Sequence, residues 1–285
     1  MIKKIVLILI LVLTTAVSFS QEKPAYVIYT AKGTKVNFGK MLKELSTTDV
    51  ILFGELHNNP IAHWLQLELS KAIAKDKSVI LGAEMLESDN QNVLNNYLNN
   101  KITLKEFKTQ ARLWPNYDTD YSPLVEFAKE NKLPFIATNI PRVYANLVYK
   151  KDFKALDTLS QTEKNWIAPL PIVFDPELPT YKNILTMMGG HGSELLVKAQ
   201  AIKDATMAHF ILQNYKPNNT FIHFNGAYHS DDYEGILWYL KQANQALSYK
   251  TISTVSQKDI QNLDKEYLNK ADFIICVDEN MTTTY

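Results

Sequence analysis

Short apolar runs alternate with helical patterns through most of the chain, and several of these runs stop abruptly at polar residues. Four of them cover residues 50–53, 78–83, 133–137 and 220–224. Continuous apolar runs of this length, bounded by turn residues, are typical of strands buried on both faces of a parallel sheet. Because helical patterns separate the runs, the sequence predicts an α/β fold with a mostly parallel central sheet flanked by helices.

Local signals place further elements around these runs. Asn59 and Pro60 are typical of a helix start, and the apolar spacing over residues 61–73 predicts one buried helical face. The first run, this helix and the second run form a βαβ unit, for which a right-handed crossover is expected. Weaker patterns predict a helix at 37–45 and strands at 25–29, 249–255 and 273–277.

Two parts of the chain lack clear strand signals. Leu94 and Leu98 have helical spacing within a segment rich in Asn, Gln and Lys. Residues 88–132 are too many for a simple loop, so we predict a helical insertion that forms a smaller helical subdomain. Residues 150–215 are predicted to add loops and short helices, followed by a long helix that begins near Ser193.

Polar side chains follow the predicted strands. Glu55 and His57 end the first strand, Glu84 ends the second, and His229 lies just after the fourth. The carboxyl ends of parallel strands share one edge, where ligands bind in open α/β sheets. We therefore expect these four side chains to converge on one rim. Imidazole and carboxylate groups suit a Mn, Co or Zn ion, or acid–base catalysis.

Each of these groups also has a purely structural interpretation. Glu55 could accept backbone N–H bonds at the start of the following helix. Glu84 could form an ion pair with Arg112 or Arg142. Asn139 and Arg142, which end the third strand, are expected on the same rim as ligand-binding groups. A wholly structural rim is disfavoured, because one sheet edge would then hold several polar groups without a purpose.

A glycine-rich segment holds a different set of groups. His191 lies among three glycines, with Met187 and Tyr181 shortly before it. Imidazole, thioether and phenol are all haem-iron ligand types, so these three residues are candidate haem ligands. The alternative is a surface loop with an incidental histidine. The other histidines, His63, His209 and His223, are predicted to be structural.

The amino-acid composition excludes some classes of function. The chain has 285 residues with 30 basic and 30 acidic side chains. A general nucleic-acid-binding protein would show a basic excess, so no nucleic-acid partner is expected. The hydrophobic fraction of 46% allows a sizeable core. The single cysteine, Cys276, lies in an apolar run and is predicted to be a buried small hydrophobic residue.

Residues 1–20 have the pattern of a cleavable signal peptide. Lys3 and Lys4 precede an apolar stretch over residues 5–13, and small residues occupy positions 18 and 20. The mature domain would then comprise residues 21–285. We expect an exported protein of the periplasm or outer-membrane surface, and not a lipoprotein, because no cysteine follows the apolar stretch. A membrane anchor is the alternative, although the stretch is short of the roughly 20 residues that span a bilayer.

These motifs together resemble the ChaN family of haem-binding uptake proteins, over about residues 49–240. The resemblance rests on Phe53-Gly-Glu-Leu-His57, His63 with Gln66, Ala83-Glu-Met85, Gln91, Ala137-Thr-Asn-Ile-Pro-Arg142, Gln200 with Asp204 and Met207-Ala208, and Gly226 with His229. It implies an α/β domain with a smaller helical part. It also implies a pair of stacked haems at a homodimer interface, and haem or iron acquisition together with outer-membrane haem uptake machinery. Tiki-type metalloproteases and erythromycin esterases are similar in fold.

Three hypotheses follow. The first is an exported, dimeric haem-binding protein. The second is a hydrolase in which Glu55, His57, Glu84 and His229 are the catalytic and metal-binding groups, or in which His57 and Glu55 act as a metal-free base. The third is a binding module for another ligand at the same rim. His57→Ala and His229→Ala are expected to abolish any activity or ion binding and to leave the fold largely intact.

Overall fold

The computed structural model describes residues 23–187 and 193–285. The predicted signal peptide and His191 lie outside the described residues. The strands are β1 (Tyr26–Thr30), β2 (Lys35–Val36), β3 (Val50–Glu55), β4 (Ser78–Glu87), β5 (Phe135–Asn139), β6 (Asn219–Gly226), β7 (Tyr249–Gln257) and β8 (Phe273–Asp278).

The helices are α2 (Phe38–Leu45), α3 (Pro60–Ala74), α4 (Gln91–Leu98), α5 (Leu104–Gln110), α6 (Ser122–Glu130), α7 (Arg142–Lys151), α8 (Gln161–Lys164), α9 (Pro179–Met187), α10 (Glu194–Asn214) and α11 (Ile236–Ala243). Short helical turns are η1 (Ser88–Asn90), η2 (Tyr117–Tyr121), η3 (Phe153–Thr158), η4 (Ala227–His229), η5 (Asp231–Tyr233) and η6 (Lys265–Tyr267). Within the described residues, no helix is both long and apolar enough to cross a membrane.

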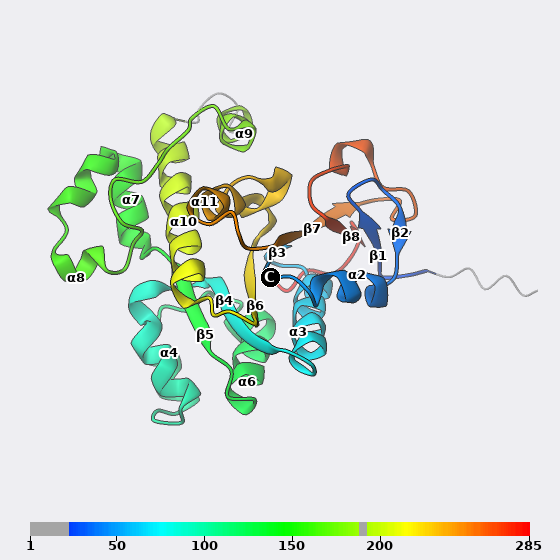
Figure 1. The fold of residues 1–285 in the computed structure, drawn as a ribbon, viewed down its shortest axis with the longest axis horizontal. Coiled ribbons are helices and arrows are strands. Elements are labelled where there is room, and N and C mark those ends of the chain that lie inside the picture. Colours follow the sequence, from blue (N-terminus) through cyan, green and yellow to red (C-terminus); the bar gives the residue numbers. More distant parts are fainter. Residues whose placement is uncertain (1–22, 188–192) are drawn as a thin grey trace, which may run out of the picture.

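One sheet organises the fold, with the strand order β2-β1-β8-β7-β3-β6-β4-β5 (Figure 1). The strands from β8 to β5 are parallel, and β1 and β2 add an antiparallel edge. The predicted α/β fold with a mostly parallel sheet is therefore confirmed. β6 lies between β3 and β4, so the two strands of the predicted βαβ unit are not neighbours.

Helices cover both faces of the sheet, as strands with apolar side chains on both faces require. Along β3, Ile51 and Phe53 face a cluster formed with α2, α3, α4, α5 and α6. Val50 and Leu52 face the opposite cluster, formed with α10 and α11. In Figure 1 the long helix α10 runs beside α7 and α11. Cys276 on β8 is fully buried, as predicted.

Two groups of helices pack into different hydrophobic clusters. The helices between residues 88 and 132 contribute to the same hydrophobic cluster as α3 and the sheet. By contrast, α7, η3 and the adjoining side of α10 form a separate cluster around Ile140, Val148 and Leu156. The smaller helical layer therefore packs on α10 rather than on the strands.

Two strand ends differ from the sequence prediction. β4 continues to Glu87 rather than ending at residue 83, so Glu84 lies within the strand, beside an irregularity in its pairing with β5. β5 begins at Phe135, because Pro134 has no N–H to donate and contributes only its carbonyl, which accepts from Leu81 N at 3.0 Å. β5 then extends through Asn139.

Candidate functional site

The carboxyl ends of β3, β4 and β6 form one buried corner. Parallel pairing places Glu55 of β3 opposite Gly226 of β6. The backbone N–H of Gly226 donates to Glu84 Oε2 at 2.7 Å. His57 and His229 lie in the turns just after β3 and β6. The structure thus brings together the four side chains that the sequence places at one rim, and we call this corner the rim cluster.

Glu55 is the acceptor at the centre of one half of the rim cluster. The carboxylate is buried, and it accepts from His57 Nδ1 at 2.9 Å, Gln66 Nε2 at 2.6 Å and Tyr121 OH at 2.8 Å. His57 keeps 35% of its side chain exposed and packs edge-on against Trp114. These bonds hold the His57 ring in one orientation, with its other nitrogen toward Gly226.

His229 is the centre of the other half. Its Nδ1 lies 2.5 Å from Asp204 Oδ1, and its Nε2 lies 3.2 Å from Glu84 Oε1. Glu84, Asp204 and His229 each leave at most 6% of the residue surface exposed. Tyr181 OH donates to the second oxygen of Asp204 at 3.0 Å. A buried imidazole is therefore clamped between two buried carboxylates.

Charge pairing sets the protonation of this buried group. Burial alone would lower the pKa of His229, but the Glu84 and Asp204 carboxylates raise it to about 10. Burial would raise the pKa of Glu84, yet the charge of His229 and the bond from Gly226 hold that pKa far below its usual range. Burial raises the pKa of Asp204 despite the opposing charge of His229. At neutral pH the cluster holds an imidazolium.

His57 is also biased toward its charged form. Burial opposes this, but the hydrogen bond to Glu55 and the nearby charge of Glu84 raise the pKa of His57 above its ordinary value. His223, which the sequence assigns a structural role, behaves in the opposite way. It is fully buried in β6, bonds to Thr138 and Asn225, and burial lowers its pKa to about 4. The rim carboxylates thus favour the charged forms of His57 and His229, whereas burial favours the neutral form of His223.

The rim cluster needs glycine at position 226. A Cβ there would lie 2.6 Å from His57 Nε2, which is closer than real Cβ contacts. We expect Gly226→Ala to push the His57 ring from Glu55 and to reduce the free energy of unfolding by about 1–3 kcal/mol, as overpacking does. Urea denaturation measures the loss, and NMR titration of His57 should show its pKa falling toward the ordinary value.

Gly39→Ala is the matched control for that substitution. A Cβ at Gly39 would meet only Asn37 Oδ1, at an ordinary 3.6 Å, in the exposed part of α2. Alanine favours helices over glycine by about 1 kcal/mol, so this variant should be unchanged or more stable. Equal losses in the two variants would contradict the close packing of His57 on Gly226.

The other predicted site residues lie apart from the rim cluster or behind it. Tyr181 is 1% exposed, and its hydroxyl is engaged by Asp204, so an iron could reach it only after that bond breaks. Met187 is the last residue of α9. Arg142 is exposed at the start of α7, and Asn139 lies on the edge strand β5. Glu84 pairs with His229, whereas Arg112 pairs with Glu87 and Asp89, so neither suggested Glu84–arginine pair forms.

Three members of the corner carry no functional role in the sequence interpretation: Asp204, Tyr121 and Gln66. Asp204 does have a detectable signal, because it is a charged residue on the buried face of the long helix α10. Charged side chains in such positions are almost always paired. Tyr121 has no comparable signal, since it lies in the short turn η2, where aromatic residues are ordinary.

A pocket of about 720 Å³ opens beside the rim cluster. Its lining includes His57, His229, Tyr228, Tyr267 and Lys270. Tyr228 OH donates to Thr180 O at 2.7 Å, and burial raises its pKa to about 12. This volume lies in the range of small-molecule sites. We call it the rim pocket.

The rim cluster does not fit a metal ion. Metal ligands need lone pairs that are free to bind. The nitrogens of His229 bond to the Glu84 and Asp204 carboxylates, and the oxygens of Glu55 and Glu84 accept hydrogen bonds from neighbouring donors. In the part of the chain that the structure describes, no three His, Cys, Asp or Glu side chains are placed to hold a metal ion.

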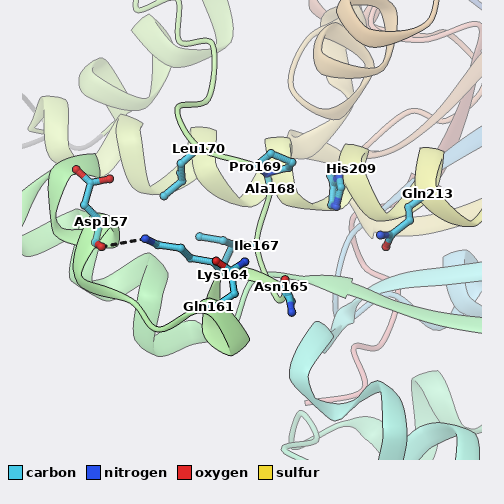
Figure 2. Close-up of a pocket in the computed structure, with 10 residues that line it drawn as sticks. All are labelled: Asp157, Gln161, Lys164, Asn165, Ile167, Ala168, Pro169, Leu170, His209 and Gln213. Atoms are coloured by element: carbon cyan, nitrogen blue, oxygen red, sulfur yellow. Dashed lines mark hydrogen bonds between the residues drawn. The ribbon is translucent and has the colours of Figure 1, made fainter.

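A second hollow lies along the outer side of α10. Figure 2 shows His209 and Gln213 of α10 beside the segment that carries Ala168 and Pro169. These four residues line both a cavity of about 470 Å³ and an adjoining one of about 550 Å³. We call the joined cavities the α10 groove.

Comparisons with known proteins agree with this architecture. A structure described as "Cofacial heme binding to ChaN of Campylobacter jejuni" is 20% identical, covers 90% of this chain and 98% of its own, and has a TM-score of 0.68. A Bacillus cereus protein is 11% identical over 87% of this chain and 93% of its own, with a TM-score of 0.53. An erythromycin esterase mutant is 10% identical over 90% and 98%, also with a TM-score of 0.53. At these identities the likeness establishes the fold.

Sequence comparison identifies the family. No curated protein sequence matches the chain. The sequence model of the family described as "Haem-binding uptake, Tiki superfamily, ChaN" matches residues 41–240, which include the whole rim cluster and the helices on both faces of the sheet. The chain therefore belongs to the ChaN family of haem-binding uptake proteins within the Tiki superfamily.

Proposed function

We propose that this protein binds haem. The observation that carries the proposal is the family match over residues 41–240. Those residues contain β3 to β6, α10 and most of α11, and they supply nearly all of the lining of the α10 groove and part of the rim pocket. The ChaN structure from C. jejuni, which shares this fold, is described as showing cofacial haem binding.

We further propose that the protein is exported, that it forms a homodimer holding a pair of haems, and that it serves haem or iron acquisition with outer-membrane uptake machinery. The basic and apolar pattern of residues 1–20 supports export. The resemblance to ChaN proteins supports the pair of haems and the uptake role.

Adding ferric hemin to the purified mature chain is expected to give a shifted Soret band that saturates at one hemin per chain. A protein-held iron has a defined axial ligand and an apolar surrounding, and free hemin in buffer has neither. Absorbance titration measures the shift, and light scattering of the same samples measures whether loading yields dimers. A spectrum that stays the same as that of free hemin would remove the haem-binding proposal.

We do not propose the metal-dependent hydrolase. Its four assigned ligands, Glu55, His57, Glu84 and His229, are bonded mainly to each other and to Asp204, Gln66 and Tyr121. Their geometry supports a rigid ionic corner at the strand ends, on which the shape of the rim pocket depends.

A further inference from the structure

We infer that residues 279–285 form a strap that closes one side of the rim pocket and opens to admit a ligand to His57. The strap follows β8 and runs to the turn between β3 and α3, which carries His57. This role is independent of the proposed haem binding, because it concerns access to the rim pocket and uses contacts that the proposed function does not.

The strap has a fixed base where it leaves the sheet. Glu279 N–H donates to the Gln257 carbonyl at the end of β7, at 3.1 Å. Met281 N–H then donates back to the Asp278 carbonyl at 2.9 Å. The backbone and side-chain amides of Asn280 both donate to Asp278 Oδ1 at 2.9 Å. These bonds form a tight turn directly after β8, so the base of the strap stays in place.

Thr284 makes the second attachment of the strap. Its N–H donates to the Asn58 carbonyl at 3.0 Å. Its Oγ1 donates to Asp120 Oδ2 at 2.7 Å. Asp120 is only 2% exposed, so the side-chain bond reaches a buried carboxyl group. A single residue thus holds the far part of the strap, through one backbone bond and one side-chain bond.

This second attachment lies beside the backbone of His57. Asn116 Nδ2 is within hydrogen-bond distance of both Asp120 Oδ2, at 2.6 Å, and the His57 carbonyl, at 3.0 Å. Tyr285, the neighbour of Thr284, lines the rim pocket together with His57. The strap therefore supplies part of the pocket wall and is bonded to the same groups that hold the backbone of His57.

The strap can open while the domain stays folded. None of residues 279–285 is buried, and Tyr285 leaves 65% of its surface exposed. Thr282 and Thr283 are exposed, and no backbone hydrogen bond joins them to the rest of the described chain. Segments with few buried contacts open locally at a small cost in free energy. Breaking the two bonds of Thr284 is therefore enough to release the strap.

The opposite walls of the rim pocket are rigid. Thr254 of β7 is 1% exposed, and its Oγ1 donates to the Gly54 carbonyl at 2.8 Å. His229 is clamped between Glu84 and Asp204. A rigid hollow with one weakly held wall is the usual arrangement of a site that opens and closes through a loop or tail.

The reaction of His57 with diethylpyrocarbonate tests the strap in variants of the full chain. This reagent modifies accessible neutral imidazoles, and mass spectrometry gives the rate at each histidine in mildly alkaline buffer. Thr284→Pro removes both the N–H and the hydroxyl donor. We expect His57 to react about 3- to 10-fold faster in this variant, because the loss of two hydrogen bonds shifts the strap toward its open form. Thr284→Val removes only the hydroxyl and should give a smaller increase.

Thr282→Val is the matched control for Thr284→Val. Thr282 is exposed, and its hydroxyl bonds to no group within residues 23–187 and 193–285. In this variant His57 should react at the wild-type rate. His209 lines the α10 groove and not the rim pocket, so its rate is the internal reference and should be the same throughout. An unchanged rate at His57 in Thr284→Pro would overturn the inference, and so would an equal rise at His57 and His209.

Hydrogen exchange of the unaltered chain tests the strap without any substitution. If the strap opens by itself, the Thr284 amide exchanges at a rate that low urea concentrations do not change. The amide of Phe53, in the buried strand β3, exchanges through larger unfolding and should accelerate with urea. NMR spectra measure both rates. Equal urea dependence of the two amides would mean that the strap is released only when the domain unfolds, which contradicts its role as a gate.

Discussion

Replacing His229 with alanine is expected to lower the free energy of unfolding by about 3–5 kcal/mol, the usual cost of removing one partner from a buried ion pair. The substitution leaves Glu84 and Asp204 facing each other, both almost fully buried and without the cation that lies between them. One carboxylate must then take up a proton or admit water, and either change costs free energy. This expectation replaces the sequence-based one, which treated His229 as dispensable for folding.

Urea denaturation followed by circular dichroism measures the effect. His209→Ala is the matched control, because it removes a half-buried histidine that has no ionic partner within the described residues. It should change stability by no more than about 0.5 kcal/mol, as substitutions away from paired groups do. If the two variants lose the same amount, the Glu84–His229–Asp204 arrangement does not stabilise the fold.

The second large effect is a loss of stability in alkaline solution. The pKa of His229 is 6.5 when it is unperturbed and about 10 in the folded chain. A raised folded pKa means that the stabilisation is fully present below pH 6.5 and declines as pH rises through 10. The shift sets an upper limit of roughly 5 kcal/mol on this loss, at 1.36 kcal/mol for each pKa unit. Denaturant midpoints measured between pH 6 and pH 10 should therefore fall.

A double variant isolates the contribution of His229 to this decline. Glu84→Gln with Asp204→Asn removes both carboxylates, so the buried imidazole should be neutral across the whole pH range. The double variant should be less stable at pH 6 and should lose the steep decline toward pH 10. A decline that is as steep as in the wild type would assign the alkaline sensitivity to other groups, such as Lys270.

The strands and the gathering of the rim cluster follow from local sequence. An apolar run that ends at Glu55 or before His229 specifies both a buried strand and the edge at which it stops. Parallel pairing then places such ends together whatever the strand order. For this reason the corner could be expected without knowing which strands are neighbours.

The strand order and the full set of partners could not be derived in this way. All the parallel strands are similarly apolar, so nothing in their composition indicates that β6 pairs with both β3 and β4. The pairing of Glu84 with His229, rather than with an arginine, depends on that order. Asp204 contacts the same histidine from α10, about 120 residues further along the chain than Glu84. The periodicity of apolar residues does not predict contacts between residues so far apart in the sequence.

The surroundings of His209 depend on an arrangement that local patterns do not record. Its helix spacing is that of an ordinary half-buried residue. Only the packing of the segment near Pro169 against α10 shows that the imidazole borders two cavities. The chemistry of a histidine is readable from sequence, whereas the space around it is not.

The central position of β3 has a consequence for biosynthesis. Both of its neighbours, β6 and β7, come from the last third of the chain. While a ribosome is still making the first two hundred residues, β3 has no native strand to pair with, and its apolar edge stays open to wrong partners. Final folding must therefore follow translation of most of the chain, and a holding chaperone during that interval would protect it from aggregation.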